Sequence, residues 1–302
     1  MNASWLHLPL ALILSPLLLG VVNRTKSLVA GRKGPPLVQV YRDLWRLLRK
    51  GAVYSRTTSW VFRAGPVVCL AATLAALALL PFGGSAAPLA FTGDLVLLAT
   101  LFGLVRFFIV AAALDTGSSF EGMGASREVW FSALAEPALL LALAALARMS
   151  GVLSLSGFLG GAVAAVPATQ APVLVLVIAA LVIVLLAENS RLPVDDPNTH
   201  LELTMIHEVM LLDTSGPDLA MASYAAALKL WALAALVVGA AMPWRSGQFW
   251  TDAGLALLGM ALVAVGVGMI ESTMARLRLP RVSHLLLAAV ACAAVAMILV
   301  LR

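Results

Sequence analysis

Several ionisable side chains lie within long apolar stretches of this 302-residue chain. Glu128 and Glu136 belong to one stretch, and on a helix their spacing places them about 12 Å apart along the axis and on roughly one side. The others are Arg106, Glu188, Lys229 and Glu271. Ionisable groups within a membrane mark ion pathways or pair with one another. A structural ion pair explains any single residue equally well, but the whole set favours a path for protons or ions.

The densest polar segment is 187–216, AENSRLPVDDPNTHLELTMIHEVMLLDTSG. Pro193 and Pro197 predict a break after the preceding helix. The pattern then predicts a new helix with Asn198 or Thr199 as its cap. The segment contains nine ionisable residues: Glu188, Arg191, Asp195, Asp196, His200, Glu202, His207, Glu208 and Asp213. Three residues apart on a helix, Glu188 and Arg191 can pair, unless the nearby Pro193 bends that turn.

This spacing fits a proton relay better than a metal site. His200, Glu202, His207 and Glu208 point in different directions around the predicted helix, and the HExxH spacing of zinc sites does not occur. A hydrated relay uses the same residue types without fixed ligand geometry, because carboxylates and histidines pass protons near neutral pH. Cys69 and Cys292 show no metal-ligand spacing and are expected only to pack.

A second polar segment, DTGSSFEGMGASRE at 115–128, has three glycines and predicts a tight, buried turn. It lacks the GxxxxGK[ST] pattern that cradles phosphate, and the chain has no dinucleotide fingerprint. No Ser/His/Asp arrangement indicates nucleophilic catalysis. The chain is therefore expected to be non-catalytic.

The composition indicates which elements position these residues. The chain is 62% hydrophobic and 12% charged, whereas soluble domains are roughly a quarter charged. About 20 apolar residues are needed to cross a bilayer, and such spans must be helical. We therefore expect an all-α, multi-pass membrane protein with eight spans, at about 5–22, 60–81, 93–114, 128–148, 170–187, 219–241, 252–274 and 282–301.

The positions of Lys and Arg predict the orientation. Fifteen of the 20 lie in the segments after spans one, three, five and seven. By the positive-inside rule these segments are cytoplasmic and the N-terminus is outside. The predicted cytoplasmic loops of this single membrane domain, 1–302, are about 23–59, 115–127, 188–218 and 275–281. The net charge of +5 thus reflects topology and not nucleic-acid binding.

Residues 36–50, PLVQVYRDLWRLLRK, predict a short amphipathic helix. Its leucines, Leu44, Leu47 and Leu48, share one face, and its arginines share another. Such a helix lies on the membrane surface or forms a docking surface for a soluble partner. The predicted docking residues are Arg32, Lys33, Arg42, Arg46 and Arg49.

Four segments together carry a family resemblance: GRKGPPLVQVYRDLWRLLRK, ALDTGSSFEGMGASRE, AENSRLPVDDPNTHLEL and ESTMARLRLPR. In this order they resemble the respiratory complex I subunit 1 family. The nearest branch is that of the membrane subunits of formate hydrogenlyase and group 4 nickel–iron hydrogenases. The resemblance implies eight core spans, an outside N-terminus, and a position between a soluble electron-transfer arm and antiporter-like subunits.

The resemblance also implies which acids act. Family acids match Glu128 in ASRE, Glu188 in AEN and Glu202 in LEL, and further ones match Glu136 and Glu271. The complete predicted relay is Glu128, Glu136, Glu188, Glu202, Glu271, Arg191, His207 and Glu208. Departures at Asn198–His200, Asp213–Gly216 and Asn23–Arg24 weigh against a quinone site.

The expected function is that of a membrane subunit linking the soluble arm of a hydrogenase-like complex to proton or sodium translocation. No cofactor is expected in this chain, and nickel–iron and iron–sulfur centres are expected in partner subunits. The expected partners are hydrogenase large and small subunits, an iron–sulfur subunit and antiporter-like subunits, in the inner (plasma) membrane. The alternatives are a quinone-site subunit of a complex I-like dehydrogenase, an independent secondary transporter, and an anchor without ion coupling.

Overall fold

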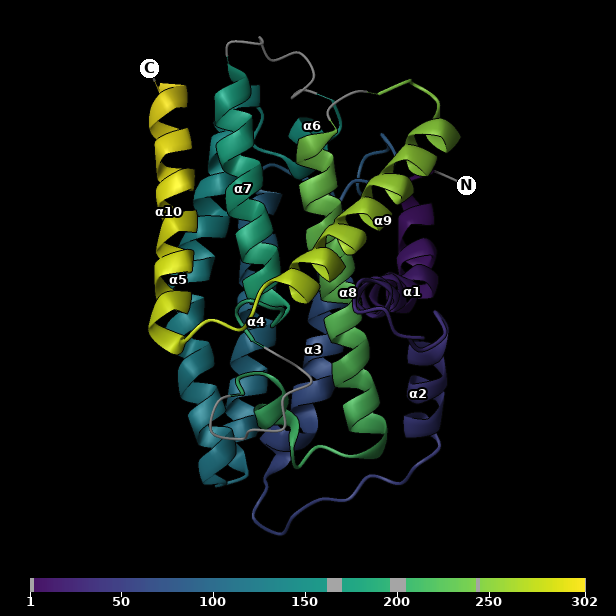
Figure 1. Cartoon of the computed structure of the whole chain (residues 1–302). Helices are drawn as coiled ribbons and strands as arrows, with labels where there is room; N and C mark the ends of the chain where they lie inside the picture. Colours follow the sequence, from purple (N-terminus) through teal and green to yellow (C-terminus); the bar gives the residue numbers. More distant parts are fainter. Residues whose placement is uncertain (1–2, 162–169, 196–204, 243–244, 302) are drawn as a thin grey trace.

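The structure, a computed structural model, describes residues 3–161, 170–195, 205–242 and 245–301 as a bundle of helices (Figure 1). In chain order these are η1 (Ala3–Leu6), α1 (His7–Val29), α2 (Gln39–Leu48), α3 (Trp60–Ala78), α4 (Asp94–Asp115), α5 (Ser119–Ser150), α6 (Leu155–Leu159), α7 (Ala171–Glu188), η4 (Glu208–Leu211), α8 (Gly216–Ala241), α9 (Phe249–Thr273) and α10 (Leu279–Leu301). Eight of them are long and apolar enough to cross a membrane: α1 together with η1, α3, α4, α5, α7, α8, α9 and α10. The prediction of an all-α protein with eight spans is confirmed.

The largest error in the predicted spans is at the start of α5. This helix begins at Ser119, so most of the segment predicted as a glycine-rich turn is helical. The chain reverses at Gly117, whose φ is +72°. Gly124 instead allows close packing, because a Cβ there would lie 2.3 Å from Cγ1 of Val209 and 2.8 Å from the carbonyl oxygen of Ile206. The glycine provides space for the segment before α8.

The first span is also longer than predicted, since α1 continues to Val29. Polar residues in its last two turns satisfy their hydroxyls by bonding within the helix. Thr25 donates to the carbonyl oxygen of Val21 at 2.9 Å, and Ser27 donates to that of Asn23 at 2.9 Å. The extension brings Lys26 onto a helix that packs against α9.

α8 is the most buried of the eight spanning helices, and α1, α3, α7 and α9 pack around it. α5 packs against α4, α7 and α10, and α9 crosses the bundle diagonally to reach α1 (Figure 1). Both termini lie at the same end of the bundle, as eight crossings require (Figure 1). An outside N-terminus stays a prediction, because a bundle by itself has no inside or outside.

At the opposite end of the bundle, polar contacts join the loops. The backbone N–H of Ser59 donates to Asp115 at 2.6 Å, and the N–H of Val53 donates to the Ser215 hydroxyl at 3.0 Å. Glu121 is fully buried and accepts from the N–H of Asp213 at 3.0 Å and from the Thr116 hydroxyl. These bonds hold the beginning of α3, the end of α4 and the beginnings of α5 and α8 together.

The short helix α2 contacts α1 and α8, and in Figure 1 it stands beside the lower part of α8. The Tyr41 hydroxyl donates to the carbonyl oxygen of Ile13, which attaches α2 to α1. Its leucine face is only partly covered: Leu44 and Leu47 are half-buried, whereas Leu48 is 54% exposed. The helix predicted at 36–50 is confirmed, and it rests its leucine face partly on the bundle.

Candidate functional site

The centre of the bundle contains a carboxylate held between two cations. Glu188, the last residue of α7, places Oε1 3.0 Å from Nη1 of Arg106 on α4 and Oε2 2.7 Å from Nζ of Lys229 on α8. The three side chains are at most 8% exposed. Buried charges persist only when they are paired, so this triad joins α4, α7 and α8 electrostatically.

Glu136 extends the triad toward the outer surface of the bundle. Its Oε2 lies 3.6 Å from Nη2 of Arg106, and its side chain is 40% exposed. Gly103 on α4 lies next to it, since a Cβ there would be in ordinary contact with Oε1 of Glu136 at 3.6 Å. The charged row therefore runs from Lys229 at the centre to a half-exposed carboxylate between α4 and α5.

Glu188 does not pair with Arg191 as the sequence allowed, because Arg191 turns away from α7. Ser190 adopts a left-handed conformation with φ of 49°, and the Arg191 N–H bonds to the carbonyl oxygen of Leu186 at 2.9 Å. This geometry ends a helix. Arg191 consequently approaches Glu271 on α9, with Nη1 3.5 Å from Oε1.

Glu271 thus belongs to a second buried ionic cluster. Its other oxygen lies 2.8 Å from Nζ of Lys26 on α1, and the Glu271 side chain has no exposed area. Close packing of α1 and α9 makes this contact. A Cβ on Gly268 would lie 2.7 Å from Cβ of Thr25 and 2.9 Å from the carbonyl oxygen of Val22.

A cavity of about 210 Å³ connects the two clusters. Glu188 and Lys229 line it together with Arg191, as do His207 and Glu208. The remaining lining residues come from α1, α4, α8 and the segment after α7: Leu19, Val105, Ile109, Asn189, Ser190, Asp195, Leu211, Ala222, Ser223, Ala225, Ala226 and Ala227. The cavity has room for several water molecules, and charged side chains of both clusters lie along its wall.

Glu128 lies on the other side of the triad. With Arg106 and Glu188 it lines a smaller cavity of about 10 Å³, which has room for about one water molecule. Within the part of the chain that the structure describes, no side chain forms an ion pair with Glu128. The structure therefore places Glu128, Glu136 and Glu188 around Arg106, and their role as a relay stays a prediction.

His207 and Glu208 face the larger cavity, near the described end of the loop after α7. Burial, together with the charges of Lys229 and Arg191, lowers the pKa of His207 from 6.5 to about 4. His207 is therefore neutral at pH 7, which corrects the expectation of a histidine titrating near neutrality. Its place on the cavity wall allows it to donate or accept a hydrogen bond without carrying charge.

Part of the predicted relay lies outside the described residues. The relay residue concerned is Glu202. Outside the described residues lie also Asp196 and His200, and the expected helix cap at Asn198 or Thr199. In the described ranges, no group of three His, Cys, Asp or Glu side chains is arranged to hold a metal ion.

Five residues form ion pairs in the site that the sequence pattern did not predict. Arg106 and Lys229 attract notice as charges within spans, but nothing in their spacing connects them to Glu188. Lys26, Asp195 and Arg276 also form buried or partly buried ion pairs here. Each pair joins residues far apart in sequence, so only the tertiary fold reveals it.

The five predicted docking residues are all exposed: Arg32, Lys33, Arg42, Arg46 and Arg49. Arg46 lies 3.9 Å from Asp43, and the Arg49 guanidinium lies over the Trp45 ring at 5.4 Å. Exposed pairs of this kind contribute little to stability. The arginines remain accessible to a partner, and their docking role stays a prediction.

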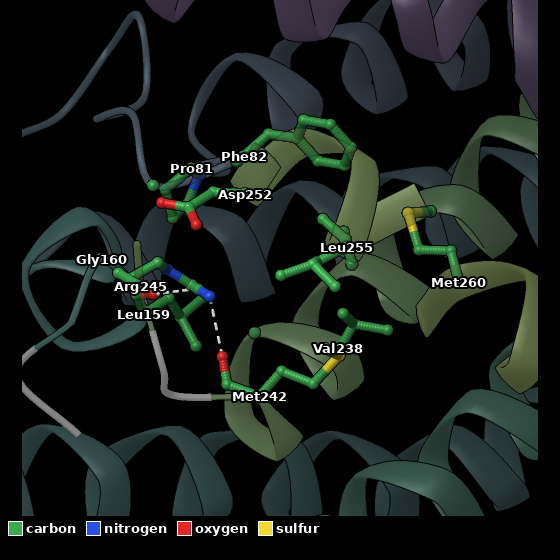
Figure 2. A pocket seen from close by; sticks show the side chains of 15 residues that line it. Pro81, Phe82, Leu159, Gly160, Val238, Met242, Arg245, Asp252, Leu255 and Met260 are labelled. Carbon is green, nitrogen blue, oxygen red and sulfur yellow. Dashed lines mark hydrogen bonds between the residues drawn. The ribbon is translucent and has the colours of Figure 1, made fainter. Parts of the chain in front are cut away.

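Another cavity, of about 20 Å³, lies at the far end of α8 (Figure 2). The Arg245 guanidinium donates to the carbonyl oxygens of Met242 and Leu159 at 2.7 Å each. Asp252, which lines the same cavity, accepts from the N–H and hydroxyl of Ser246 at 2.8 and 2.7 Å. These bonds hold α6, α8 and α9 together at this end, away from the central charged row.

Comparisons with known proteins place the whole chain among membrane subunits of redox complexes. The family model for NADH dehydrogenase matches residues 2–302. The chain is 34% identical to formate hydrogenlyase subunit 4 of Escherichia coli (strain K12) over 278 residues, 89% of each chain. It is 32% identical to hydrogenase-4 component C of the same organism over 282 residues, 90% of this chain and 87% of the other.

A solved structure shares the fold. It is a chain of the membrane-bound sulfane sulfur reductase, an archaeal respiratory membrane complex. The TM-score is 0.85 at 20% sequence identity, covering 99% of this chain and 98% of that one. The helix bundle, the sequence relatives and the family match lead to one conclusion: the chain belongs to the NADH dehydrogenase family, that of complex I subunit 1, and is a multi-pass membrane subunit of the complex I type.

Proposed function

We propose that this subunit couples electron transfer in a hydrogenase- or formate hydrogenlyase-like complex to the movement of protons, or of sodium ions, through its central charged row. The observation that carries the proposal is Glu188, whose two oxygens contact Arg106 and Lys229 between two cavities. A small movement of α7 or of the following loop would change both contacts together. In a low-dielectric interior such changes strongly alter proton affinity.

Charge balance distinguishes the roles of the acids. Two cations, Arg106 and Lys229, face two carboxylates that they contact directly, Glu188 and Glu136. Glu128 is a third carboxylate beside the same arginine in the small cavity. A third negative charge there would lack a partner of its own, so Glu128 is the group assigned to carry a transferable proton. Glu188 acts as the switch that alternately holds and releases the cations.

The row also provides a route for transfer. The 210 Å³ cavity, which has room for water, is lined by Glu188 and Lys229 and by His207 and Glu208. At the other end of the row, the half-exposed Glu136 meets the lateral surface of the bundle. A carboxylate is costly against lipid, so this surface suits a neighbouring membrane subunit that continues the path. An antiporter-like subunit is the proposed neighbour.

The remaining partners follow from the resemblance and the relatives. The soluble arm is proposed to contain hydrogenase large and small subunits and an iron–sulfur subunit, which would hold the nickel–iron and iron–sulfur centres. The exposed arginines of α2 and the loop containing Arg32 and Lys33 provide a basic surface for that arm. Glu202, from the segment after α7, is proposed as a further relay acid.

The test replaces one carboxylate at a time in the whole complex. Glu188→Gln and Glu128→Gln each keep the shape of the side chain and remove its titratable proton. The measurement is the number of ions moved per electron in proteoliposomes. We expect the ratio to fall at least several-fold in either variant, with the subunit still assembled.

Asp252→Asn is the matched control, because it makes the same carboxylate-to-amide change at the far end of α8, in the cavity of Figure 2. The ratio should be unchanged in this variant, even if the loop around Ser246 is less stable. An unchanged ratio in both glutamine variants would mean that the row is structural, and the anchor alternative would then be preferred.

A further inference from the structure

The spanning helix α1 contains Pro16 and changes direction within the bundle. In Figure 1 its first turns run along the bundle, whereas the part beside its label is seen nearly end-on. A proline has no N–H to give to the carbonyl four residues earlier, and its ring pushes against that carbonyl. The helical donor is therefore missing for Leu12, and the next bond, from the N–H of Leu17 to Ile13, is the one that a bend weakens. Both carbonyls need donors from elsewhere.

Two tyrosine hydroxyls from other helices supply these donors. Tyr224 of α8 donates to the carbonyl oxygen of Leu12 at 2.7 Å, and Tyr41 of α2 donates to that of Ile13. Burial raises the pKa of the Tyr41 phenol, and the nearby N–H of Leu17 opposes the rise as a donor toward the phenol oxygen. Tyr41 thus lies between two groups that would bond each other in a straight helix. Prolines in spanning helices are tolerated when neighbouring groups satisfy the backbone in this way.

The two halves of α1 are attached to the bundle separately. In the first half, His7 accepts from the indole N–H of Trp231 at 3.0 Å through Nε2, and its Nδ1 lies 3.1 Å from the carbonyl oxygen of Leu80. The indole nitrogen can only donate, so the imidazole proton is on Nδ1 and is given to Leu80. In the second half, a Cβ on Gly20 would lie 2.3 Å from the carbonyl oxygen of Leu37, just before α2. The bend sets how the two halves are oriented.

The second half of α1 carries Lys26 to the second ionic cluster, where its Nζ lies 2.8 Å from Glu271. Lys26 comes ten residues after Pro16. This is about 15 Å along a helix, so a change of about 10° in the bend displaces Lys26 by about 2.6 Å. Thr25 already packs against α9, since a Cβ on Gly268 would lie 2.7 Å from its Cβ. The displacement is therefore away from α9, and it lengthens the ionic contact.

We propose that Tyr41 and Tyr224 are positioning residues: by replacing the donors lost at the bend they fix the direction of α1 and thereby hold Lys26 in the second ionic cluster. The inference goes beyond the proposed function, because it holds whichever ion the chain moves. Its consequence for the site lies in Arg191, which approaches the same Glu271 carboxylate as Lys26 and lines the large cavity. When Lys26 withdraws, Arg191 is the cation that remains at this carboxylate.

A double-variant cycle tests whether the tyrosine hydroxyl and the proline act together. Pro16→Ala restores the N–H that the Leu12 carbonyl lacks, so the Tyr224 hydroxyl is then no longer needed there. Tyr224→Phe removes the hydroxyl alone. We expect Tyr224→Phe to lower the thermal midpoint of the purified complex by about 4 °C. Combined with Pro16→Ala, the same change should lower the midpoint by about half as much or less.

Tyr54→Phe is the matched control, because it removes a hydroxyl from the chain's remaining tyrosine, which lies beside Phe62 and Arg63 of α3. Its effect should be the same with and without Pro16→Ala. Equal losses from Tyr224→Phe in the two proline backgrounds would overturn the proposal, because the hydroxyl would then stabilise something other than the bend. A coupling to Pro16→Ala as large for Tyr54→Phe would overturn it as well.

The direction of α1 is measured by pulsed electron paramagnetic resonance in the assembled complex. Leu28 near the end of α1 and Trp250 near the beginning of α9 are both exposed, and each is replaced by a spin-labelled amino acid. Leu28 lies about 18 Å beyond the bend, so a change of about 10° moves it by about 3 Å. Tyr41→Phe/Tyr224→Phe should shift or broaden the distance distribution accordingly, and Tyr54→Phe should leave it as in the parent.

An unchanged distance distribution in the double tyrosine variant would contradict the proposal, because α1 would then keep its direction without the hydroxyls. The two single tyrosine variants decide the matter in the same way if the double variant does not assemble. The distance measurement also decides alone if Pro16→Ala does not assemble. Neither measurement follows ions, so failure of the proposed relay and failure of this inference are distinguishable.

Discussion

At the scale of residues, Glu188 joins two buried ion pairs of the membrane core. It contacts two cations from two other helices, and all three side chains are almost fully buried. Buried pairs of this kind add little net stability, but removing one partner leaves an uncompensated charge. The arrangement therefore responds strongly to any change in one contact, which is the property that a coupling switch needs.

The consequence can be tested on Lys229. Lys229→Met keeps most of the volume of the side chain and removes its charge, so Glu188 would keep only Arg106. We expect the free energy of unfolding to fall by about 3–5 kcal/mol, observed as a lower thermal midpoint of the purified complex. The double variant Lys229→Met/Glu188→Gln should recover part of the loss, because the carboxylate that has lost one of its two cations is then replaced by a neutral amide. Equal losses in the single and double variants would contradict this account.

Individual residues also show which parts of the site could be predicted from the sequence and which could not. Glu128, Glu136 and Glu188 could be selected from the sequence because acids within apolar stretches are rare. The partner of Glu188 could not, since Arg191 is near in sequence and Arg106 is distant. A left-handed Ser190 turns Arg191 away, and non-glycine residues seldom adopt that conformation. Nothing in the sequence indicates the turn.

At the scale of elements, glycines decide how closely helices approach. The sequence suggested that the glycines of segment 115–128 make a turn, yet Gly124 is within α5 and accommodates Val209. A glycine that permits a turn and a glycine that permits close packing look alike in a sequence. Only the neighbouring segment distinguishes them, and that segment comes from a distant part of the chain.

Gly268 provides a test with an internal control. A Cβ there would lie 2.7 Å from Thr25, whereas a Cβ at Gly266 would have no heavy atom within 4 Å. Gly268→Ala should push α9 away from α1 and lengthen the contact between Lys26 and Glu271, at a cost of about 1–3 kcal/mol from overpacking. Gly266→Ala, on the same helix, should be neutral or slightly stabilising. Thermal unfolding of both variants, measured side by side, checks the prediction, and equal midpoints would contradict it.

At the scale of the whole molecule, the spans were predictable because about 20 apolar residues can only cross a bilayer as a helix. Each predicted span overlaps one long helix of the bundle. The family was also predictable, from four segments that recur in order. Both termini share one end of the bundle in the structure (Figure 1), while the orientation in the membrane rests on the positions of Lys and Arg.

The orientation is tested by labelling in intact cells, in a chain with Cys69 and Cys292 replaced by alanine. A cysteine at exposed Gln248 should react with an impermeant thiol reagent from outside, because the residue lies between α8 and α9. A cysteine at exposed Lys50, in the basic loop before α3, should react only after the cells are opened. The reverse pattern would mean that the chain has the opposite orientation in the membrane, with the proposed cytoplasmic and outer sides exchanged.

The most direct test of the central claim observes the proton itself. Infrared difference spectra of the complex, recorded as its redox centres are cycled, report whether a carboxyl group gains or loses a proton. We predict a carboxyl C=O band in the parent complex that disappears in Glu128→Gln and remains in Asp252→Asn. Persistence of the same band in Glu128→Gln would contradict the claim that the charged row around Arg106, Glu188 and Lys229 carries protons through Glu128.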